Sequence, residues 1–236
     1  MTRSVAVISG AAGGIGRAVV ERFERQGWSC FGIDRVAGTG VNVQGDVAEP
    51  SVWERVAQEV QAHCGRADAL VNNAGTNVRG SVEEVDLATW NRILAVNLTS
   101  VFLSARYLLP LLRSSNGSIV NVASGAGLVG TRRGAAYAAS KGGVIALTRQ
   151  MAVDYASGGV RVNAVCPGVV DTGLVRQLVA SEADPELELQ RMAQGHLLGR
   201  LGTPDEIAAA IFFLASPDAS FMTGTIVPVD GELTAR

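Results

Sequence analysis

The chain has 236 residues, of which 47% are hydrophobic and 18% charged, and its formal net charge is −2. This length suffices for a sizeable buried core, and the near-neutral charge gives no footprint for nucleic acid or for an anionic membrane surface. No apolar run approaches the roughly 20 residues of a membrane-spanning helix and the first residues lack a signal-peptide core, so we expect a cytoplasmic protein without a membrane or nucleic-acid partner. Three scattered cysteines and two histidines predict neither a disulfide framework nor a metal site.

Short apolar runs alternate with helical patterns along the whole chain. The predicted strands cover residues 4–9, 28–34, 41–46, 67–73, 117–124, 160–166 and 225–230. The predicted helices cover residues 14–26, 51–64 after Pro50, about 87–113, about 135–155 and a stretch after Pro204. Such alternation is typical of a parallel sheet covered by helices on both faces. We therefore predict one α/β domain over residues 1–236, built on a doubly wound parallel sheet of about seven strands.

A glycine-rich segment, SGAAGGIG, joins the first predicted strand to the first predicted helix and contains Gly10, Gly14 and Gly16. Its spacing differs from the general G-x-G-x-x-G motif, but the same physics applies. Residues without a Cβ atom let the backbone turn sharply toward a pyrophosphate, and the N-terminus of the following helix offers free N–H groups. The segment therefore favours a dinucleotide-binding loop of the Rossmann type, with an ordinary glycine-rich turn as the alternative.

Acidic residues follow the second and third predicted strands. Asp34 lies 18 residues beyond Gly16, where a carboxylate accepts hydrogen bonds from the adenosine ribose hydroxyls and repels a 2′-phosphate. Asp34 thus favours NAD over NADP, although the adjacent Arg35 offers a guanidinium to a 2′-phosphate. Asp46 is a candidate for holding the adenine amino group, with a turn aspartate as the alternative.

Tyr137 and Lys141 are four residues apart in a predicted helix and project from the same face. A tyrosine with a pKa near ~10 is a poor base at neutral pH, and bringing that pKa to ~7 needs about 4 kcal/mol of preferential stabilisation of the phenolate. A unit charge at ~4 Å in an effective dielectric of ~20 supplies about that energy. The pair is a predicted acid/base device, with a solvated helix pair as the alternative. Lys141 is also the single lysine among 20 basic residues.

Six motifs follow one another along the chain. They are SGAAGGIG, the NNAG of residues 72–75, Asn97 within VNLTS, Ser124 after GSIVNVAS, YAASK at 137–141, and the Pro167–Gly168 pair. Together they resemble the short-chain dehydrogenase/reductase family, and the resemblance covers essentially the whole chain. It implies hydride transfer between a nicotinamide cofactor and a substrate carbon, without a metal.

The resemblance implies a role for each motif residue. Tyr137 would exchange a proton with the substrate oxygen, and Lys141 would lower the pKa of Tyr137 and bind the nicotinamide ribose. Ser124 would position the substrate oxygen. Asn97 would organise a water that links Lys141 to solvent, whereas the residues alone favour a packing asparagine with satisfied hydrogen bonds. The implied cofactor-binding residues are Gly10, Gly14, Ile15, Gly16, Asp34, Asp46, Val47, Asn73, Ala74, Gly75, Tyr137, Lys141, Pro167, Gly168, Val170 and Thr172.

Residues 171–203 lie where the family carries a variable substrate lid, and their leucines suit an apolar cover, with ordinary helix packing as the alternative. Arg132 and Arg133, just before Tyr137, are candidates for contact with an anionic substrate or an acidic carrier protein, with a solvated loop as the alternative. Relatives are commonly tetramers, so the resemblance implies a homo-oligomer. The alanines and glycines of residues 135–143 permit close helix approach at an interface or against the sheet.

Three functions are compatible with the sequence. The first is an NAD-dependent oxidoreductase that interconverts a small-molecule secondary alcohol, such as a cyclic alcohol, diol or polyol, and its ketone. The second is a 3-oxoacyl-[acyl-carrier-protein] reductase using NADPH, which the segment GRLGTPDEIA resembles and against which Asp34 argues. The third is a non-catalytic nucleotide-sensing or scaffolding protein on the same fold, which the intact set of motif residues disfavours.

Overall fold

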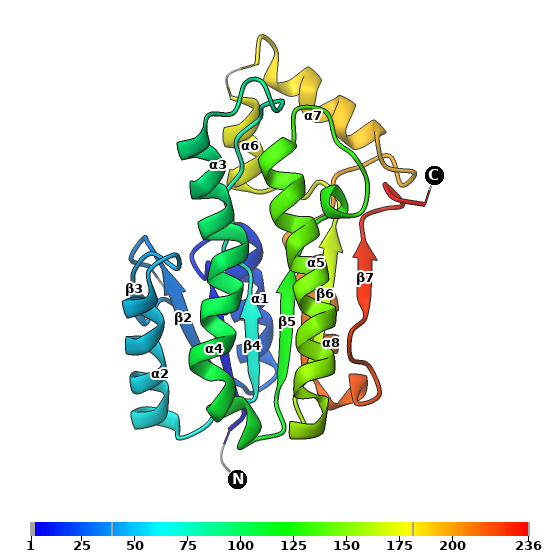
Figure 1. Ribbon diagram of the computed structural model, residues 1–236. Coiled ribbons are helices and arrows are strands. Elements are labelled where there is room, and N and C mark those ends of the chain that lie inside the picture. Colours follow the sequence, from blue (N-terminus) through cyan, green and yellow to red (C-terminus); the bar gives the residue numbers. More distant parts are fainter. Residues whose placement is uncertain (1–2, 39, 181, 236) are drawn as a thin grey trace.

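Seven parallel strands form one sheet in the computed structural model, which describes residues 3–38, 40–180 and 182–235 (Figure 1). The strands are β1 (Val5–Ser9), β2 (Ser29–Asp34), β3 (Val43–Gln44), β4 (Ala69–Asn72), β5 (Ser118–Val122), β6 (Arg161–Pro167) and β7 (Ile226–Val229). Their spatial order is β3-β2-β1-β4-β5-β6-β7, and every neighbouring pair is parallel. The order reverses between the neighbouring strands β1 and β4, which opens a crevice at their carboxyl ends. The predicted doubly wound sheet is confirmed.

Helices cover both faces of the sheet (Figure 1). One face carries α1 (Gly14–Arg25) and α8 (Pro204–Ala215), and the other carries α2 (Pro50–Cys64), α4 (Ser100–Arg113) and α5 (Ala135–Tyr155). The remaining helices are α3 (Leu87–Leu94), α6 (Gly173–Val179) and α7 (Pro185–Gln194), with a π-helical turn at Ala95–Thr99 and short 3₁₀ turns at Gly125–Gly127, Ala156–Gly158 and Pro217–Ala219. The α6–α7 segment stands beyond the carboxyl ends of the strands, where the sequence predicts a substrate lid, and this segment is called the lid below.

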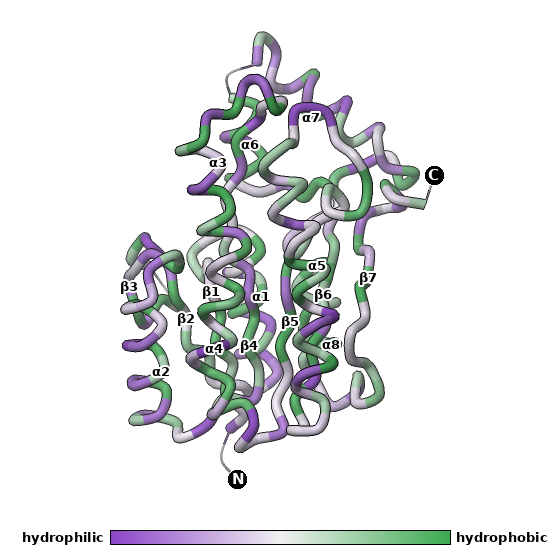
Figure 2. Tube along the Cα trace, in the orientation of Figure 1, coloured by the Kyte–Doolittle hydropathy of each residue, from purple (hydrophilic) through white to green (hydrophobic). Residues whose placement is uncertain are grey.

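The central strands are buried on both faces because alternate residues enter two separate cores. In the β1–β4 pair, Val7 lies beside Leu70 and belongs with it to the core under α2, α4 and α5. Ile8 lies beside Val71, and both belong to the core under α1 and α8. Figure 2 shows the hydrophobic colour along these strands. This two-sided burial explains why the predicted strands are nearly continuous apolar runs.

Local capping chemistry fixes where the helices begin. Pro50 is the first residue of α2, as the sequence predicts. The Thr203 side chain accepts the N–H of Glu206, whose carboxylate accepts the N–H of Thr203, so α8 begins with a capping box. Thr172 and Asp184 cap α6 and α7 in the same way, each accepting a backbone N–H from the first turn. These caps fix the residues at which α6 and α7 begin.

The third strand is shorter than predicted, covering Val43–Gln44 instead of residues 41–46. On one side, Asn42 uses its side-chain oxygen to accept the N–H of Gly32 at 2.8 Å, which replaces a regular ladder bond. On the other side, the N–H of Gly45 donates to the carbonyl of Asp34 at 2.8 Å and the chain turns away. The turn that follows β3 is thereby held close to Asp34 at the end of β2.

The predicted helix of residues 87–113 is divided by the π-helical turn Ala95–Thr99 into α3 and α4. Such turns insert an extra residue and frequently mark functional sites. The stretch Leu87–Arg113 is the one helical stretch among the described residues that is long and apolar enough to cross a membrane by length and composition alone. Half of its apolar window is buried, and its α4 part packs on the sheet and on α2.

Candidate active site

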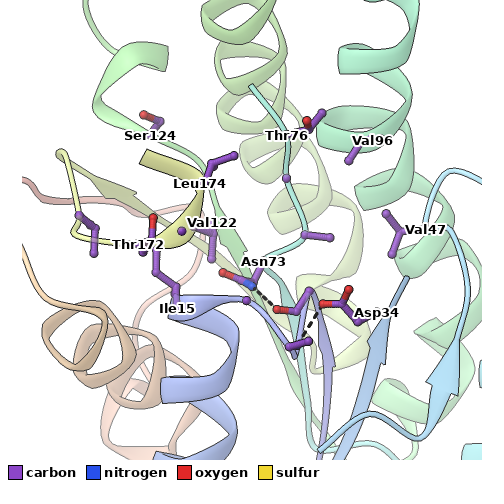
Figure 3. Close-up of a pocket in the computed structure, with 18 of the residues that line it drawn as sticks. Ile15, Asp34, Val47, Asn73, Thr76, Val96, Val122, Ser124, Thr172 and Leu174 are labelled. Carbon is purple, nitrogen blue, oxygen red and sulfur yellow. Dashed lines mark hydrogen bonds between the residues drawn. The ribbon is translucent and has the colours of Figure 1, made fainter. Parts of the chain in front are cut away.

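A cavity of about 520 Å³ opens at the carboxyl ends of the central strands. Figure 3 shows that Ile15, Asn73, Ser124 and Thr172 surround it from four different segments. The predicted site residues that line it are Gly10, Gly14, Ile15, Asp34, Asp46, Val47, Asn73, Ala74, Gly75, Ser124, Tyr137, Lys141, Pro167, Gly168, Val170 and Thr172. Gly16 and Asn97 lie behind the lining. Most of the predicted site residues therefore line one continuous pocket, and their roles in it stay predictions.

The glycine loop forms a close-packed cradle on the floor of this cavity. Gly10 has φ of +69°, a left-handed conformation that favours glycine. A Cβ atom at Gly16 would collide with the carbonyl oxygen of Gly10, and one at Gly14 would lie 3.0 Å from a methyl carbon of Thr172. Within the described chain, no side chain caps the N-terminus of α1 and its first turn has no acidic residue. The cradle therefore fits a pyrophosphate, which free N–H groups and the positive end of the helix would hold.

Asp34 lies at one end of the cavity and is fixed by two backbone donors. Its Oδ2 accepts the N–H of Ala12 at 3.0 Å, a bond dashed in Figure 3, and its Oδ1 accepts the N–H of Val36 at 3.2 Å. Each carboxylate oxygen keeps acceptor capacity for a ribose hydroxyl. Arg35 lines the same end of the cavity. The carboxylate that favours NAD and the guanidinium that could bind the 2′-phosphate of NADP are therefore both present there.

Asp46 and Val47 line the cavity beside Arg92, a residue that the sequence did not single out. Asp46 Oδ1 accepts the N–H of Ala48 at 3.0 Å, and Oδ2 accepts from the Arg92 guanidinium at 2.6 Å. Burial raises the pKa of Asp46, but the hydrogen bonds from Ala48 and Arg92 outweigh it and hold the pKa below its ordinary value. Asp46 is thus the turn aspartate of the alternative interpretation, and its contact with adenine stays a prediction.

The NNAG segment joins β4 to both of its neighbours. Asn72 is buried and donates its side-chain amide to the side chain of Asn121 on β5 at 2.9 Å. Asn73 donates to the carbonyls of Ser9 and Gly10, each at 3.1 Å. The two asparagines therefore fix the glycine loop and the centre of the sheet relative to each other, with Asn73 on the cavity side (Figure 3).

Ser124, Tyr137 and Lys141 line the wall of the cavity where β5 ends and α5 begins. The Lys141 side chain is buried, with 3% of the residue exposed. Its Nζ donates to the carbonyl oxygen of Val122 at 2.7 Å and lies 5.8 Å from the centroid of the Tyr137 ring. Burial lowers the pKa of Lys141 to about 8. The lysine therefore titrates much closer to neutral pH than an exposed one.

The net pKa of Tyr137 is not lowered in this arrangement, in contrast to the expectation from the sequence. Burial raises the pKa of Tyr137, and its hydrogen bond with Ser124 opposes this rise only in part. The sequence argument counted the attraction of a full charge but not the desolvation of the phenolate itself, which opposes ionisation. The phenol is therefore protonated at neutral pH.

Asn97 lies behind the cavity wall that Ser124, Tyr137 and Lys141 form. It lies in the π-helical turn, is 1% exposed, and uses its whole side-chain amide. Oδ1 accepts the N–H of Thr76 at 2.8 Å, while Nδ2 donates to the Thr76 carbonyl at 2.9 Å and to the Ser140 hydroxyl at 3.0 Å. This is the satisfied packing role that the residues alone favour, and the water-organising role stays a prediction. A Cβ atom at Gly75 would lie 3.6 Å from Asn97 Oδ1 and 3.7 Å from Lys141 Nζ, so Gly75 brings the loop close to both.

Several lining residues were not predicted. They include Thr76, Val96, Val122 and Gln177, of which Thr76 directly follows the NNAG motif. Gln177 lies on α6 three residues after Leu174, which also lines the cavity, so a helical reading of the lid places both on one face. The other residues come from segments whose approach is determined only by the tertiary fold.

Ion pairs hold the lid and the loop before α5. Arg79, in the loop after β4, pairs with Glu182 at 2.6 Å and with Glu188 of α7 at 2.9 Å. Arg133 donates to both oxygens of Glu84, at 3.1 and 3.2 Å. Arg133 is therefore committed to a neighbouring carboxylate, and its predicted availability to an anionic substrate is not what the structure shows.

The glycine cradle and the strand-end carboxylate define a dinucleotide-binding α/β fold. A family model described as Enoyl-(Acyl carrier protein) reductase matches residues 10–234. The chain is 41% identical to 2-(S)-hydroxypropyl-CoM dehydrogenase 3 of Xanthobacter autotrophicus, over 100% of this chain and 98% of that protein. It is 40% identical to meso-2,3-butanediol dehydrogenase of Serratia marcescens, over 98% of this chain and 94% of that protein.

The fold is also found among solved structures. The ligand-free aldohexose dehydrogenase of Thermoplasma acidophilum superimposes with a TM-score of 0.95 at 35% identity, covering 100% of this chain and 95% of that one. The chain therefore belongs to the short-chain dehydrogenase/reductase family. It is an oxidoreductase that acts on CH–OH donors.

Proposed function

We propose that the protein interconverts a secondary alcohol, such as a cyclic alcohol, a diol or a polyol, and its ketone with NAD. The observation that carries the proposal is that Ser124, Tyr137 and Lys141 share one cavity with the glycine cradle. The relatives named for hydroxypropyl and 2,3-butanediol substrates support a secondary alcohol as the substrate.

The mechanism follows from the groups on the cavity wall. When bound, the nicotinamide ring supplies the acceptor for a hydride. In the oxidation direction, Tyr137 acts in its phenolate form. Ser124 positions the substrate hydroxyl, the phenolate takes the hydroxyl proton, and the hydride leaves the carbon that carries this hydroxyl. In the reduction direction, Tyr137 gives its proton to the ketone oxygen, for which the raised pKa of the phenol is suitable. The Lys141 ammonium stabilises the phenolate that remains.

NAD is proposed over NADP because of Asp34. Its carboxylate is held at the end of the cavity by the N–H groups of Ala12 and Val36, which supports a role in accepting hydrogen bonds from the adenosine ribose of the proposed cofactor. A 2′-phosphate placed there would meet a like charge. The alternative function, reduction of a 3-oxoacyl thioester with NADPH, requires the neighbouring Arg35 to outweigh that repulsion.

A panel of cofactors and substrates tests the proposal. Initial rates are measured with NAD and NADP on cyclohexanol and 2,3-butanediol, and with NADH and NADPH on a 3-oxoacyl thioester. We expect oxidation of the alcohols with NAD to be the fastest reaction. Preferred reduction of the thioester with NADPH would favour the alternative, and absence of all turnover would overturn both.

The variant Tyr137→Phe tests the mechanism. It removes the proton-transfer group and keeps the ring, so we expect NAD binding to persist and turnover to fall by at least about 10²- to 10⁴-fold. Near-wild-type turnover would refute the role of Tyr137.

We further propose a homotetramer in the cytoplasm, as the resemblance implies. The small residues of α5 do not by themselves support an interface, because a Cβ atom at Gly143 would lie 2.7 Å from Leu98 of the same chain. Light scattering tests the assembly, and a monomer would contradict it. Cell fractionation tests the location.

A further inference from the structure

Both ends of the lid lie at the loop that follows β6. It leaves the sheet through Gly168–Val170, which follow β6, and continues through α6 and α7. Its far end returns at His196, shortly after α7, and this histidine is buried, with 4% of the residue exposed. A buried imidazole at the base of a lid needs a hydrogen-bonding explanation.

Both ring nitrogens of His196 are used, one on each side of the lid base. The N–H of Val169 donates to Nε2 at 3.0 Å, and Nδ1 lies 2.9 Å from the carbonyl oxygen of Met192 in the last part of α7. A backbone N–H can only donate, so Nε2 is the acceptor and Nδ1 carries the ring proton and donates to Met192. The neutral imidazole therefore joins the end of α7 to the loop after β6.

Two glycines make room for this ring. A Cβ atom at Gly168 would lie 2.6 Å from His196 Nε2, and one at Gly231 would lie 3.5 Å from its Cδ2 atom. Gly168 and Val170 both line the cavity, whereas Val169 between them faces the imidazole through its N–H. The hydrogen bond thus acts directly behind the cavity wall.

The carbonyl side of Val169 and the next residues are held by the segment before α8. The carbonyl of Val169 accepts the N–H of Gly202 at 2.9 Å, and the N–H of Asp171 donates to the carbonyl of Gly202 at 2.9 Å. These backbone bonds would persist if His196 were replaced. His196 is therefore the only one of these partners of the loop after β6 that holds it through a side chain, and its bond to Met192 connects the loop to α7.

We propose that His196 is a positioning residue that fixes the Gly168–Val170 wall for the cofactor and ties the lid to it. The inference rests on the proposed function, because it assumes that this wall receives the nicotinamide half of NAD. Without an acceptor at Nε2, the partly buried N–H of Val169 loses its hydrogen-bond partner, and the wall rearranges to satisfy it. Binding of NAD must then restore the wall, which weakens the affinity.

A matched pair of variants separates the two hydrogen bonds. In His196→Gln, the amide oxygen reaches the position of Nε2 and accepts from Val169, whereas in His196→Asn the shorter side chain retains a donor near Met192 and leaves Val169 unpaired. NAD affinity is measured by calorimetry, KM and kcat by initial rates, and stability by thermal melting. We expect about tenfold weaker NAD binding in His196→Asn and a change within about twofold in His196→Gln, where tenfold is about 1.4 kcal/mol.

The outcomes distinguish this inference from the proposed function. A wild-type protein that binds no NAD and oxidises no alcohol would remove the proposed function. A wild-type protein that does both, with unchanged NAD affinity and unchanged KM values in His196→Asn, would overturn the positioning role. Equal loss of affinity in both variants would overturn the role of the Nε2 acceptor.

A measurement on the wild-type protein covers the case in which a variant does not fold. The ¹⁵N shifts of the His196 ring report which nitrogen carries the proton. We expect the Nδ1–H form, with an Nε2 signal that shifts when NAD is added. The Nε2–H form, or no response to NAD that binds, would overturn the inference.

Discussion

Replacing Lys141 by methionine should change stability in a manner that depends on pH. The ammonium is buried against the Val122 carbonyl, and burial lowers the pKa of Lys141 from its ordinary value of 10.5 to about 8. The folded protein therefore disfavours the charged form, which the unfolded chain keeps until higher pH. At neutral pH, burial of this charge destabilises the fold, and the methionine variant lacks that effect.

The magnitude follows from the two pKa values. A drop from 10.5 to about 8 corresponds to about 3 kcal/mol, since each pKa unit is worth about 1.4 kcal/mol. This destabilisation is fully present below about pH 8 and fades as pH rises toward about 10.5, because the folded protein then binds fewer protons than the unfolded chain. By about pH 9.5 roughly 2 kcal/mol should have been relieved in the wild-type protein and nothing in Lys141→Met.

Urea unfolding without added cofactor measures this difference at several pH values. Packing changes and the unpaired Val122 carbonyl in the variant are independent of pH, so only the change in the stability difference is interpreted. Tyr137→Phe, one helical turn away, is the control, because the Tyr137 phenol stays largely protonated over this range and its variant should show a nearly constant difference. A constant difference between wild type and Lys141→Met from about pH 7 to 9.5 would refute the desolvation argument.

Three further outcomes are expected. Lys141→Arg conserves the charge but introduces a larger group that stays protonated, so kcat should fall by at least about 10²-fold at neutral pH, and initial rates check this. Asp34→Ser removes the carboxylate that repels a 2′-phosphate and should raise the ratio of kcat/KM for NADP to that for NAD by about tenfold or more, whereas an unchanged ratio would contradict the role of Asp34. The half-buried Arg161 guanidinium donates to the carbonyls of Leu214, Ala215, Ser216 and Met222, so Arg161→Met should lower the melting temperature by about 5 °C or more.

The sheet and the glycine cradle were predictable because their signals are local. Alternate strand residues enter different cores, so Val7 and Ile8 are both apolar although they point to opposite faces. Gly10 and Gly16 are required by a left-handed turn and by a close approach between backbone segments. Neither signal depends on residues far along the chain.

The contacts at the base of the lid and the charge state of the cavity wall were not predictable, because they depend on residues that only the tertiary fold brings together. His196 meets Val169 only after the lid has folded back, and Arg92 reaches Asp46 only because the fold brings α3 beside the loop that follows β3. The sequence contained these residues but gave no spacing that joins them. The raised pKa of Tyr137 depends likewise on burial, which a four-residue spacing does not report.

The buried position of Lys141, the single lysine of this chain, is unfavourable for the stability of the fold. An ammonium in a buried position destabilises the protein by about 3 kcal/mol, a large part of the roughly 5–15 kcal/mol that holds a domain together. Lys141 donates there to a backbone carbonyl, and Gly75, which has no side chain, brings the loop next to its Nζ. Such conflicts concentrate at functional sites, where a group is needed for chemistry rather than for packing. If Lys141 acts as proposed, Lys141→Met loses turnover, while its stability relative to the wild type rises as pH falls from about 9.5 toward about 8. No purely structural role of this lysine predicts that combination.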